Sequence, residues 1–319
     1  MKKITIISLA LLCAAACNKG TETLGHKSIS VTASIASMSK VAYDGEKSAF
    51  EVGDGLSLFS WTGDNTAIDP DALVVDGVTN TLDESGLWIP DVQMLWLDMV
   101  TPHYFMAVSP ARDVESFTED PFELDSSADK YQDNDLLIAT SVEGLKANDN
   151  PVELTFDHAM AKLNVNLKFR NQWTPQEDLP GDPNVEPGIV GVFATAKQTA
   201  CINYLEKAVS PTGDAAYMPL NKITNATWTS LIIPQEGFRT ITLYVDFDGT
   251  KRMLYETYVF THSADITLES GKVTTVNLIV GRDQITLDEA EGGITITDWT
   301  TGEVVNNGEA QIPEEGERD

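Results

Sequence analysis

Four histidines, His26, His103, His158 and His262, are the side chains best suited to acid–base or metal chemistry near neutral pH. None lies in an H-E-x-x-H motif or has cysteines and carboxylates at metal-ligand spacing around it. His158 directly follows Asp157, and an aspartate that orients a histidine is a familiar catalytic arrangement. Neighbouring residues on a strand point to opposite faces, however, so Asp157 cannot orient His158 if this segment is extended.

Other motifs for catalysis or cofactor binding are also missing from the sequence. It contains no G-x-S-x-G elbow, P-loop or G-x-G-x-x-G. The acidic pairs Asp69/Asp71 and Asp246/Asp248 do not complete a calcium-binding loop, and Asp248-Gly249 is typical of a hairpin turn. We therefore predict a non-enzymatic protein with no catalytic residue, no metal site and no cofactor.

Six tryptophans offer a different chemistry, since aromatic faces can stack on sugar rings. Trp88 and Trp173 lie near expected loops and are the candidate ligand contacts. Trp61 and Trp299 end alternating segments, which favours a packing role for both.

The charge of the chain restricts its partners. The 319 residues include 49 acidic and 21 basic side chains, so the formal net charge is −28. Such a chain repels phosphate backbones, which argues against nucleic-acid binding. The composition, 42% apolar and 22% charged, is that of a globular protein.

The N-terminus predicts export. Lys2 and Lys3 precede an apolar run over 4–16, which is too short to span about 30 Å of hydrocarbon as a helix. Small residues lead directly to Cys17, as in a bacterial lipoprotein signal, so we expect residues 1–16 to be removed and Cys17 to be acylated. An ordinary secretory signal cleaved after an A-x-A site is the alternative. Cys201 then remains as the one other cysteine, which excludes an intramolecular disulfide between structural cysteines.

Short alternating segments dominate the rest of the sequence and predict an all-β fold. The segment 163–169 alternates without interruption, and 240–260 is typical of a hairpin. With no helices expected between strands, we predict antiparallel β-sandwiches. The expected strands are 28–35, 56–61, 103–108, 135–140, 152–156, 163–169, 189–194, 229–233, 240–247, 253–260, 272–280 and 293–299.

A proline-rich stretch divides the chain. Between residues 170 and 188 the apolar pattern stops, and four prolines occur within thirteen residues, which excludes a central strand. We interpret this stretch as the connection between two domains, 17–170 and 171–319, or as a long loop beside that connection. The acidic end, 314–319, is expected to be a flexible tail.

Several phrases of the sequence, in their order and spacing, resemble the fimbrillin family of Bacteroidales, the Mfa-like outer-membrane lipoproteins and type V pilins. They are FEVGDGLSLF at 50–59, YFMAVSP at 104–110, DLLIAT at 135–140, LTFDHAMAKLNV at 154–165, LIIPQ at 231–235 and ITITDW at 294–299. The resemblance implies two transthyretin-like β-sandwich domains in tandem, a lipoprotein signal and assembly into surface fimbriae.

The resemblance also implies assembly by strand exchange. In the family, a protease cuts after a basic residue in the loop that follows the first strand, and a strand of the next subunit fills the groove left behind. Here 28–35 would be the removable strand, and Lys40 and then Lys47 are the candidate cleavage positions. The family is cleaved after arginine, whereas the first arginine of this chain is Arg112. A subunit that keeps its first strand and acts as an anchor is therefore the alternative.

From these features we predict a fimbrial subunit or accessory subunit at the outer membrane, lipid-anchored, serving adhesion. Its expected partners are other fimbrial subunits by donor-strand exchange, the membrane through the N-terminal lipid, and host or bacterial surface glycans or proteins. The rival hypothesis is a monomeric glycan-binding surface lipoprotein that assists polysaccharide uptake.

Overall fold

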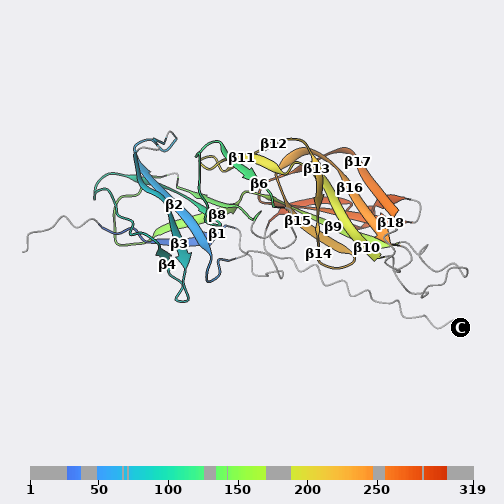
Figure 1. Ribbon diagram of the computed structural model, residues 1–319, viewed down its shortest axis with the longest axis horizontal. Coiled ribbons are helices and arrows are strands. Elements are labelled where there is room, and N and C mark those ends of the chain that lie inside the picture. Colours follow the sequence, from blue (N-terminus) through green and yellow to red (C-terminus); the bar gives the residue numbers. More distant parts are fainter. Residues whose placement is uncertain are drawn as a thin grey trace, which may run out of the picture.

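The chain folds almost entirely into β-strands. The computed structural model describes residues 27–36, 49–66, 68–69, 72–125, 134–141, 143–169, 188–246, 256–281 and 284–299. It is elongated, with the earlier part of the chain (blue to green) at one end and the later part (yellow to red) at the other (Figure 1). The predicted all-β class is confirmed. In the described part of the chain, no helix is long and apolar enough to cross a membrane.

The N-terminal half is built on one seven-stranded sheet, in the order β1-β8-β7-β5-β2-β3-β4. Its strands are β1 (Val31–Ile35), β2 (Gly55–Thr62), β3 (Leu73–Leu82), β4 (Trp88–Pro90), β5 (His103–Ser109), β7 (Leu137–Thr140) and β8 (Val152–His158). Consecutive residues of a strand point to opposite faces of the sheet, and in β2 both Leu58 and Phe59 are buried, at 0% and 3% exposure. The middle strands of this sheet are therefore covered on both faces.

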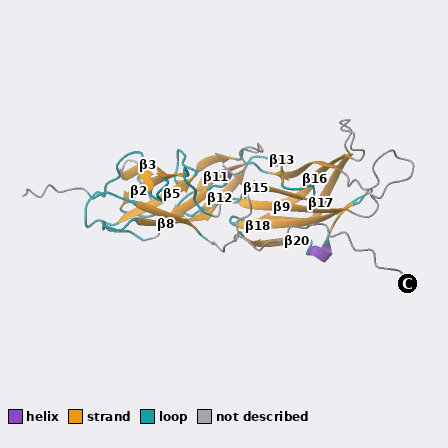
Figure 2. Cartoon of the chain, turned by 90° about the horizontal axis from the view of Figure 1, so that it is seen from below, coloured by secondary structure: helices purple, strands orange, loops and turns teal. Residues whose placement is uncertain are grey.

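The C-terminal half is a sandwich of two sheets (Figure 2). One sheet has the order β13-β10-β16-β17, and its strands are β10 (Gly188–Ala196), β13 (Ala216–Pro219), β16 (Gln235–Asp246) and β17 (Glu256–Leu268). The other has the order β14-β15-β9-β18-β19, with β20 also paired to β18. Its strands are β9 (Ala161–Phe169), β14 (Asn221–Lys222), β15 (Thr227–Ile232), β18 (Lys272–Val280), β19 (Ile285–Leu287) and β20 (Ile294–Asp298), with the 3-10 turn η4 (Glu289–Glu291) before β20.

A third, small sheet joins the two halves. It combines β6 (Asp120–Glu123) from the first half with β11 (Thr199–Asn203) and β12 (Ala208–Thr212) from the second, and it lies between them in Figure 1. The Tyr204 hydroxyl donates to Asp120 Oδ2 at 2.7 Å, and the Thr140 hydroxyl donates to the Tyr204 carbonyl at 2.8 Å. One buried cluster accordingly runs from Phe59 and Met106 of the first sheet to Ile241 and Val276 of the sandwich. The halves thus share a sheet and a core.

Three expectations about the organisation are wrong. The pairs β1–β8 and β9–β18 are parallel, so the sheets are not purely antiparallel. The strand β9 pairs with β15 and β18, so the change from one half to the other falls at Ala159–Met160 and not at residue 170. The proline-rich stretch, of which 170–187 lie outside the described residues, falls between β9 and β10 of the C-terminal sandwich, so it is not the connection between the halves; its alternative interpretation as a long loop beside that connection agrees with this position. The expected hairpin is confirmed, because β16 and β17 pair in antiparallel fashion.

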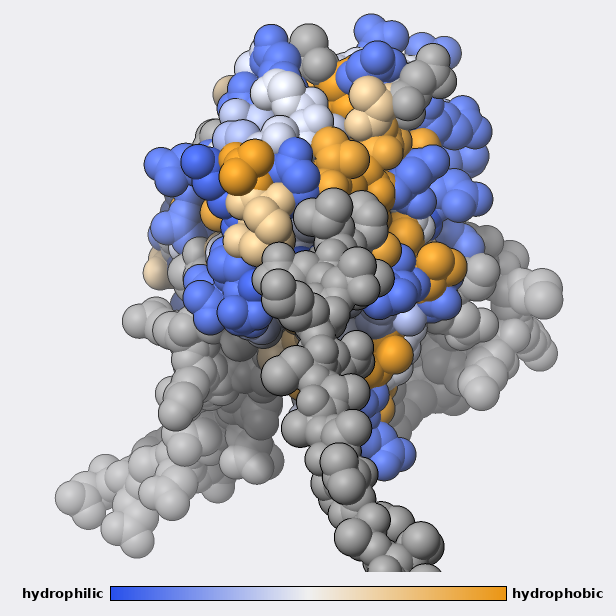
Figure 3. Space-filling model, turned by 90° about the vertical axis from the view of Figure 1, so that its left-hand side faces the viewer, coloured by the Kyte–Doolittle hydropathy of each residue, from blue (hydrophilic) through white to orange (hydrophobic). Residues whose placement is uncertain are grey.

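Exposed apolar side chains are concentrated in the N-terminal half. Seen from that end, orange apolar residues form a band between hydrophilic flanks (Figure 3). Among the described residues, the most exposed large apolar side chains of this half are Val52, Leu87, Ile89, Val92, Leu97, Met99 and Val100.

Asp98 fixes the turn that presents Met99 and Val100 by accepting hydrogen bonds from the backbone of Val100 and Thr101. The hydrogen bond from the Thr101 hydroxyl, followed by these two backbone bonds, lowers the pKa of Asp98 to about 2.

Candidate functional site: the first strand and the pocket at its end

The strand β1 lies at the edge of the seven-stranded sheet, and among the described strands it pairs with β8 alone. Its residues alternate, with Val31 and Ile35 buried at 5% exposure each and Thr32 exposed. Burying an aliphatic side chain of this size stabilises a fold by roughly 1.5–3 kcal/mol. The strand is therefore held by a few apolar side chains and by one row of backbone hydrogen bonds.

The residues beneath β1 form a continuous apolar floor. Met94, Trp96, Val152, Leu154 and Phe156 belong to the same buried cluster as Ile29, Val31 and Ile35. Ahead of the strand, the Ile29 amide donates to the Met94 carbonyl at 2.9 Å and the Trp96 amide donates to the Lys27 carbonyl at 2.9 Å. If β1 were absent, this floor and the edge of β8 would be uncovered.

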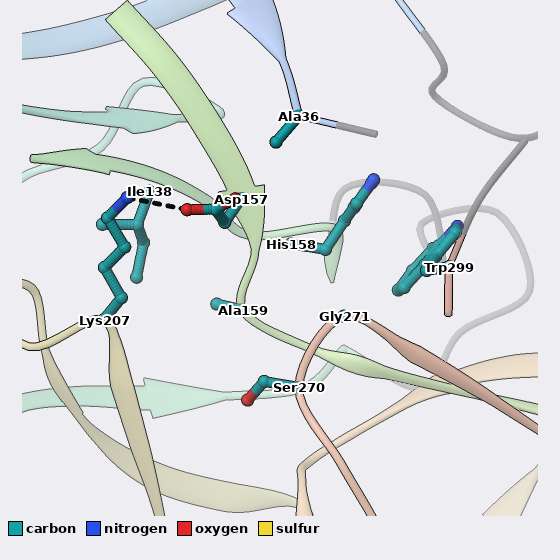
Figure 4. Close-up of a pocket in the computed structure, with 9 residues that line it drawn as sticks. All are labelled: Ala36, Ile138, Asp157, His158, Ala159, Lys207, Ser270, Gly271 and Trp299. Atoms are coloured by element: carbon teal, nitrogen blue, oxygen red, sulfur yellow. Dashed lines mark hydrogen bonds and ion pairs between the residues drawn. The ribbon is translucent and has the colours of Figure 1, made fainter. Parts of the chain in front are cut away.

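A pocket of about 280 Å³ lies at the end of β1, where the two halves meet (Figure 4). Ala36, which follows β1, and Trp299, which follows β20, both line it. The remaining lining residues are Ile138, Asp157, His158, Ala159, Lys207, Ser270 and Gly271. The pocket therefore adjoins the ends of β1 and β20, the first and last of the described strands.

His158 is fixed between a carboxylate and an aromatic ring. Its Nδ1 is 2.8 Å from Asp135 Oδ1, and both side chains are buried. The ring stacks on Trp299 with 4.1 Å between ring centroids. On the other side of the β8 strand, Asp157 accepts a hydrogen bond from Lys207 Nζ at 2.7 Å (Figure 4). The alternation rule is thus confirmed: Asp157 does not orient His158.

The Trp299 ring also lies near a buried cation. Lys162 Nζ is 5.9 Å from the ring centroid, and the Lys162 residue is only 5% exposed. Burial lowers the pKa of Lys162 to about 8. The packing role expected for Trp299, at 6% exposure, and for Trp61, at 1%, is confirmed. The sequence did not single out Asp135 or Lys162, because neither has a motif around it.

The other described histidines have structural surroundings. His103 is fully buried, accepts from the Leu97 amide at Nε2 and contacts the Thr101 carbonyl at Nδ1, and burial lowers its pKa. His262 Nδ1 contacts the Ala264 carbonyl. Within the part of the chain that the structure describes, no three histidine, cysteine or acidic residues cluster as a metal site would require.

Most of the residues predicted as sites lie outside the part of the chain that the structure describes. Cys17, Lys40, Lys47 and Trp173 lie outside the described residues. Trp88 is 8% exposed, and its ring meets Phe50 edge-on with 5.1 Å between centroids. This burial leaves no open face for a sugar ring, so the structure gives no support to Trp88 as a ligand contact.

Comparison with known proteins places this geometry in a family. The model of the family described as fimbrillin-like matches residues 40–299. A solved structure from Bacteroides uniformis, assigned to cell adhesion, superposes with a TM-score of 0.61 at 16% identity over 87% of this chain and 99% of that one. Another from Bacteroides ovatus, also assigned to cell adhesion, gives 0.63 at 17% identity over 87% and 99%.

The identities to these structures are low enough that they show the fold alone. A search of curated proteins finds no match. The family match, by contrast, extends over most of the sequence and includes strands of both halves. The chain therefore belongs to the fimbrillin-like family.

Proposed function

We propose that this chain is a non-enzymatic fimbrial subunit, acylated at Cys17, whose first strand is removed at the cell surface and replaced by a strand of the next subunit. The observation that carries the proposal is the place of β1: an edge strand with buried apolar side chains and, in the described part of the chain, a single strand partner. A strand held in this way can be exchanged for another of the same pattern without altering the rest of the sheet.

The connection after β1 supports the proposed cleavage. Residues 37–48 lie between Ala36 and Ala49 and contain both Lys40 and Lys47. A cut after either lysine would leave β1 attached to the sheet by non-covalent contacts alone. Its loss would uncover the floor formed by Met94, Trp96 and Phe156.

Limited trypsin digestion of the chain 17–319, followed by mass spectrometry and electrophoresis in SDS without boiling, tests this function. We expect a cut after Lys40 or Lys47, a folded remainder and SDS-resistant ladders. The variant in which both lysines are glutamine is the matched control and should stay monomeric. Ladders from this control, or a cut protein that never polymerises, would contradict strand exchange.

The family match and the lipoprotein-like N-terminus also fit a subunit that keeps β1 and anchors the fimbria. This version predicts that β1 resists protease. The glycan-binding lipoprotein remains the second candidate, and it predicts a monomer under all conditions together with retention on polysaccharide. The anchor would act in adhesion, whereas the glycan-binding lipoprotein would assist polysaccharide uptake.

A further inference from the structure

The turn over residues 97–100 presents three apolar side chains to solvent, although the chain has a formal net charge of −28. Leu97 and Met99 are each 53% exposed, and Val100 is 70% exposed. They belong to the N-terminal half, whose end carries a band of apolar residues (Figure 3). Exposed apolar groups gathered in this way mark a candidate contact surface.

The turn is held in one conformation by hydrogen bonds. The Asp98 carboxylate accepts from the Val100 amide at 2.8 Å, and from the amide and the hydroxyl of Thr101 at 2.6 Å each. Ahead of it, the Leu97 amide donates to Nε2 of His103, which is fully buried. The charge of Asp98 is thus directed at its own turn, and the apolar side chains stay exposed.

The same turn adjoins the point where the described chain begins. Residues 27–29 run antiparallel to 94–96: the Trp96 amide donates to the Lys27 carbonyl at 2.9 Å, and Ser28 and Leu95 form a β-bridge. Leu97 follows directly. The apolar turn and the first described residue are therefore fixed next to each other.

The distance from this point to Cys17 is limited by the length of the chain. Ten residues, 17–26, precede Lys27, and ten residues span at most about 35 Å when fully extended. An acyl chain on Cys17 would therefore keep the surface of a bilayer within about that distance of Lys27. Of the exposed apolar groups in the described structure, those of 97–100 lie beside the attachment of this tether.

The charges around the turn favour a neutral surface. Lys27 Nζ pairs with Asp149 at 2.5 Å, and the Asp149 side chain is 95% exposed. With Asp98 in the turn itself, the surroundings have more acidic than basic groups. Anionic lipids would be repelled, whereas zwitterionic headgroups would not.

The size of the turn argues against a lasting contact with a second copy. A stable protein interface uses about 20–30 residues on each partner, and this turn offers four. A tethered contact with a bilayer needs far less, because a short linker raises the effective concentration to the order of millimolar.

We propose that the 97–100 turn rests on the neutral surface of the bilayer that holds the Cys17 lipid. This inference depends on the acylation in the proposed function and adds a second contact to it. Leu97, Met99 and Val100 would enter the boundary between headgroups and acyl chains, where apolar side chains of peripheral proteins bind. Because the molecule is elongated (Figure 1), contact through its N-terminal half would hold the C-terminal half away from the membrane.

A fluorescent label on the turn tests the proposal. The chain 17–319 carries Cys17→Ser and Cys201→Ser, and an N-terminal hexahistidine tag tethers it to phosphatidylcholine vesicles that contain a nickel-chelating lipid. A nitrobenzoxadiazole dye is attached at Met99→Cys. We expect tethering to raise its emission at least threefold, because the dye leaves water, and a spin-labelled lipid to quench it. The same dye at Ile223→Cys, at a position 51% exposed in the C-terminal half, should not respond.

A substitution in the turn tests whether its apolar character matters. In the protein labelled at position 99, Leu97→Asp should reduce the rise in emission at least twofold. Val52→Asp, at an apolar position 63% exposed in the same half, is the matched control and should leave the rise unchanged. Circular dichroism of each variant confirms that it is folded.

Three results would overturn the proposal: no rise at position 99, an equal rise at position 223, or equal effects of the two aspartate substitutions. A rise without vesicles that grows with protein concentration would also overturn it, and would assign the turn to a second copy. Because the nickel-chelating lipid supplies the tether, none of these results depends on acylation or strand exchange. Those are measured separately, by mass spectrometry of the exported protein and by digestion.

Discussion

The indole of Trp299 lies parallel to the imidazole of His158, with an angle of 8° between the ring planes. This contact fastens the residue after β20 to the residue that ends β8, next to Ala36 at the end of β1. By contrast, four of the five residues of β20 are exposed. Trp299 is therefore the main side-chain attachment of this edge strand.

Replacing Trp299 with alanine should consequently lower the free energy of unfolding by about 3–5 kcal/mol, the usual cost of removing a buried large aromatic ring. Equilibrium urea unfolding, followed by far-ultraviolet circular dichroism, measures the change. Ile296→Ala, at a position of β20 that is 44% exposed, is the control and should cost under about 0.5 kcal/mol. Equal effects of the two substitutions would show that Trp299 does not hold the strand.

The buried Lys162 predicts a dependence of stability on pH. Because burial lowers its folded-state pKa to about 8, the unfolded chain, with a pKa near 10.5, binds the proton more tightly between these values. The free energy of unfolding should therefore rise between about pH 8 and pH 10.5 through this group. Below pH 8 the penalty for burying the charge is fully present.

Lys162→Met removes this group while keeping the apolar stem. We expect the difference in unfolding free energy between variant and parent to favour the variant at pH 7.5 and to shrink by pH 10. Urea titrations at the two pH values measure it. A difference that does not vary with pH would mean that Lys162 keeps an ordinary pKa in the fold.

Tyr204 connects the two halves through a buried hydrogen bond to Asp120, which Arg112 also contacts at 3.2 Å. Burial, followed by the hydrogen bond to Asp120, raises the pKa of Tyr204 well above its ordinary value, so the hydroxyl stays protonated. Tyr204→Phe should cost about 1–3 kcal/mol because it leaves Asp120 with one partner fewer. Scanning calorimetry measures this cost. Tyr217→Phe, at a residue that is 61% exposed, is the control and should leave the stability near that of the parent.

A single carboxylate should suffice to detach β1. Val31→Asp places a charge on the buried side of the strand, whereas Thr32→Asp places it on the exposed side. Hydrogen exchange of the β1 amides should become at least tenfold faster in the first variant and should stay near the parent rate in the second. Similar rates in both variants would indicate that apolar burial does not hold the strand.

The period-two pattern predicted individual strands well but could not predict their partners. The segment 163–169 was correctly expected to be a strand, yet it pairs with 274–280, more than a hundred residues later, and so belongs to the second half. Alternation describes which faces are buried and contains no information on long-range pairing. The strand β3 was not predicted, because Asp76, Gly77 and Asn80 weaken its pattern.

The pocket was only partly predictable for the same reason. Alternation correctly separated His158 from Asp157, but the aspartate that contacts His158 is Asp135, which the antiparallel pairing of β7 with β8 brings alongside. Trp299 reaches the same place through the pairing of β20 with β18. These contacts depend on sheet topology, which the spacing of residues along the chain does not reveal.

The sheet shared by β6, β11 and β12 has a mechanical consequence. Because the two halves are joined by strand pairing and a common core, and not by a tether, a pull along the long axis loads hydrogen bonds and packed side chains across the joint. The subunit should therefore bear tension as one stiff rod with no hinge at its middle. Any bending of a filament made from it would then occur where one subunit meets the next.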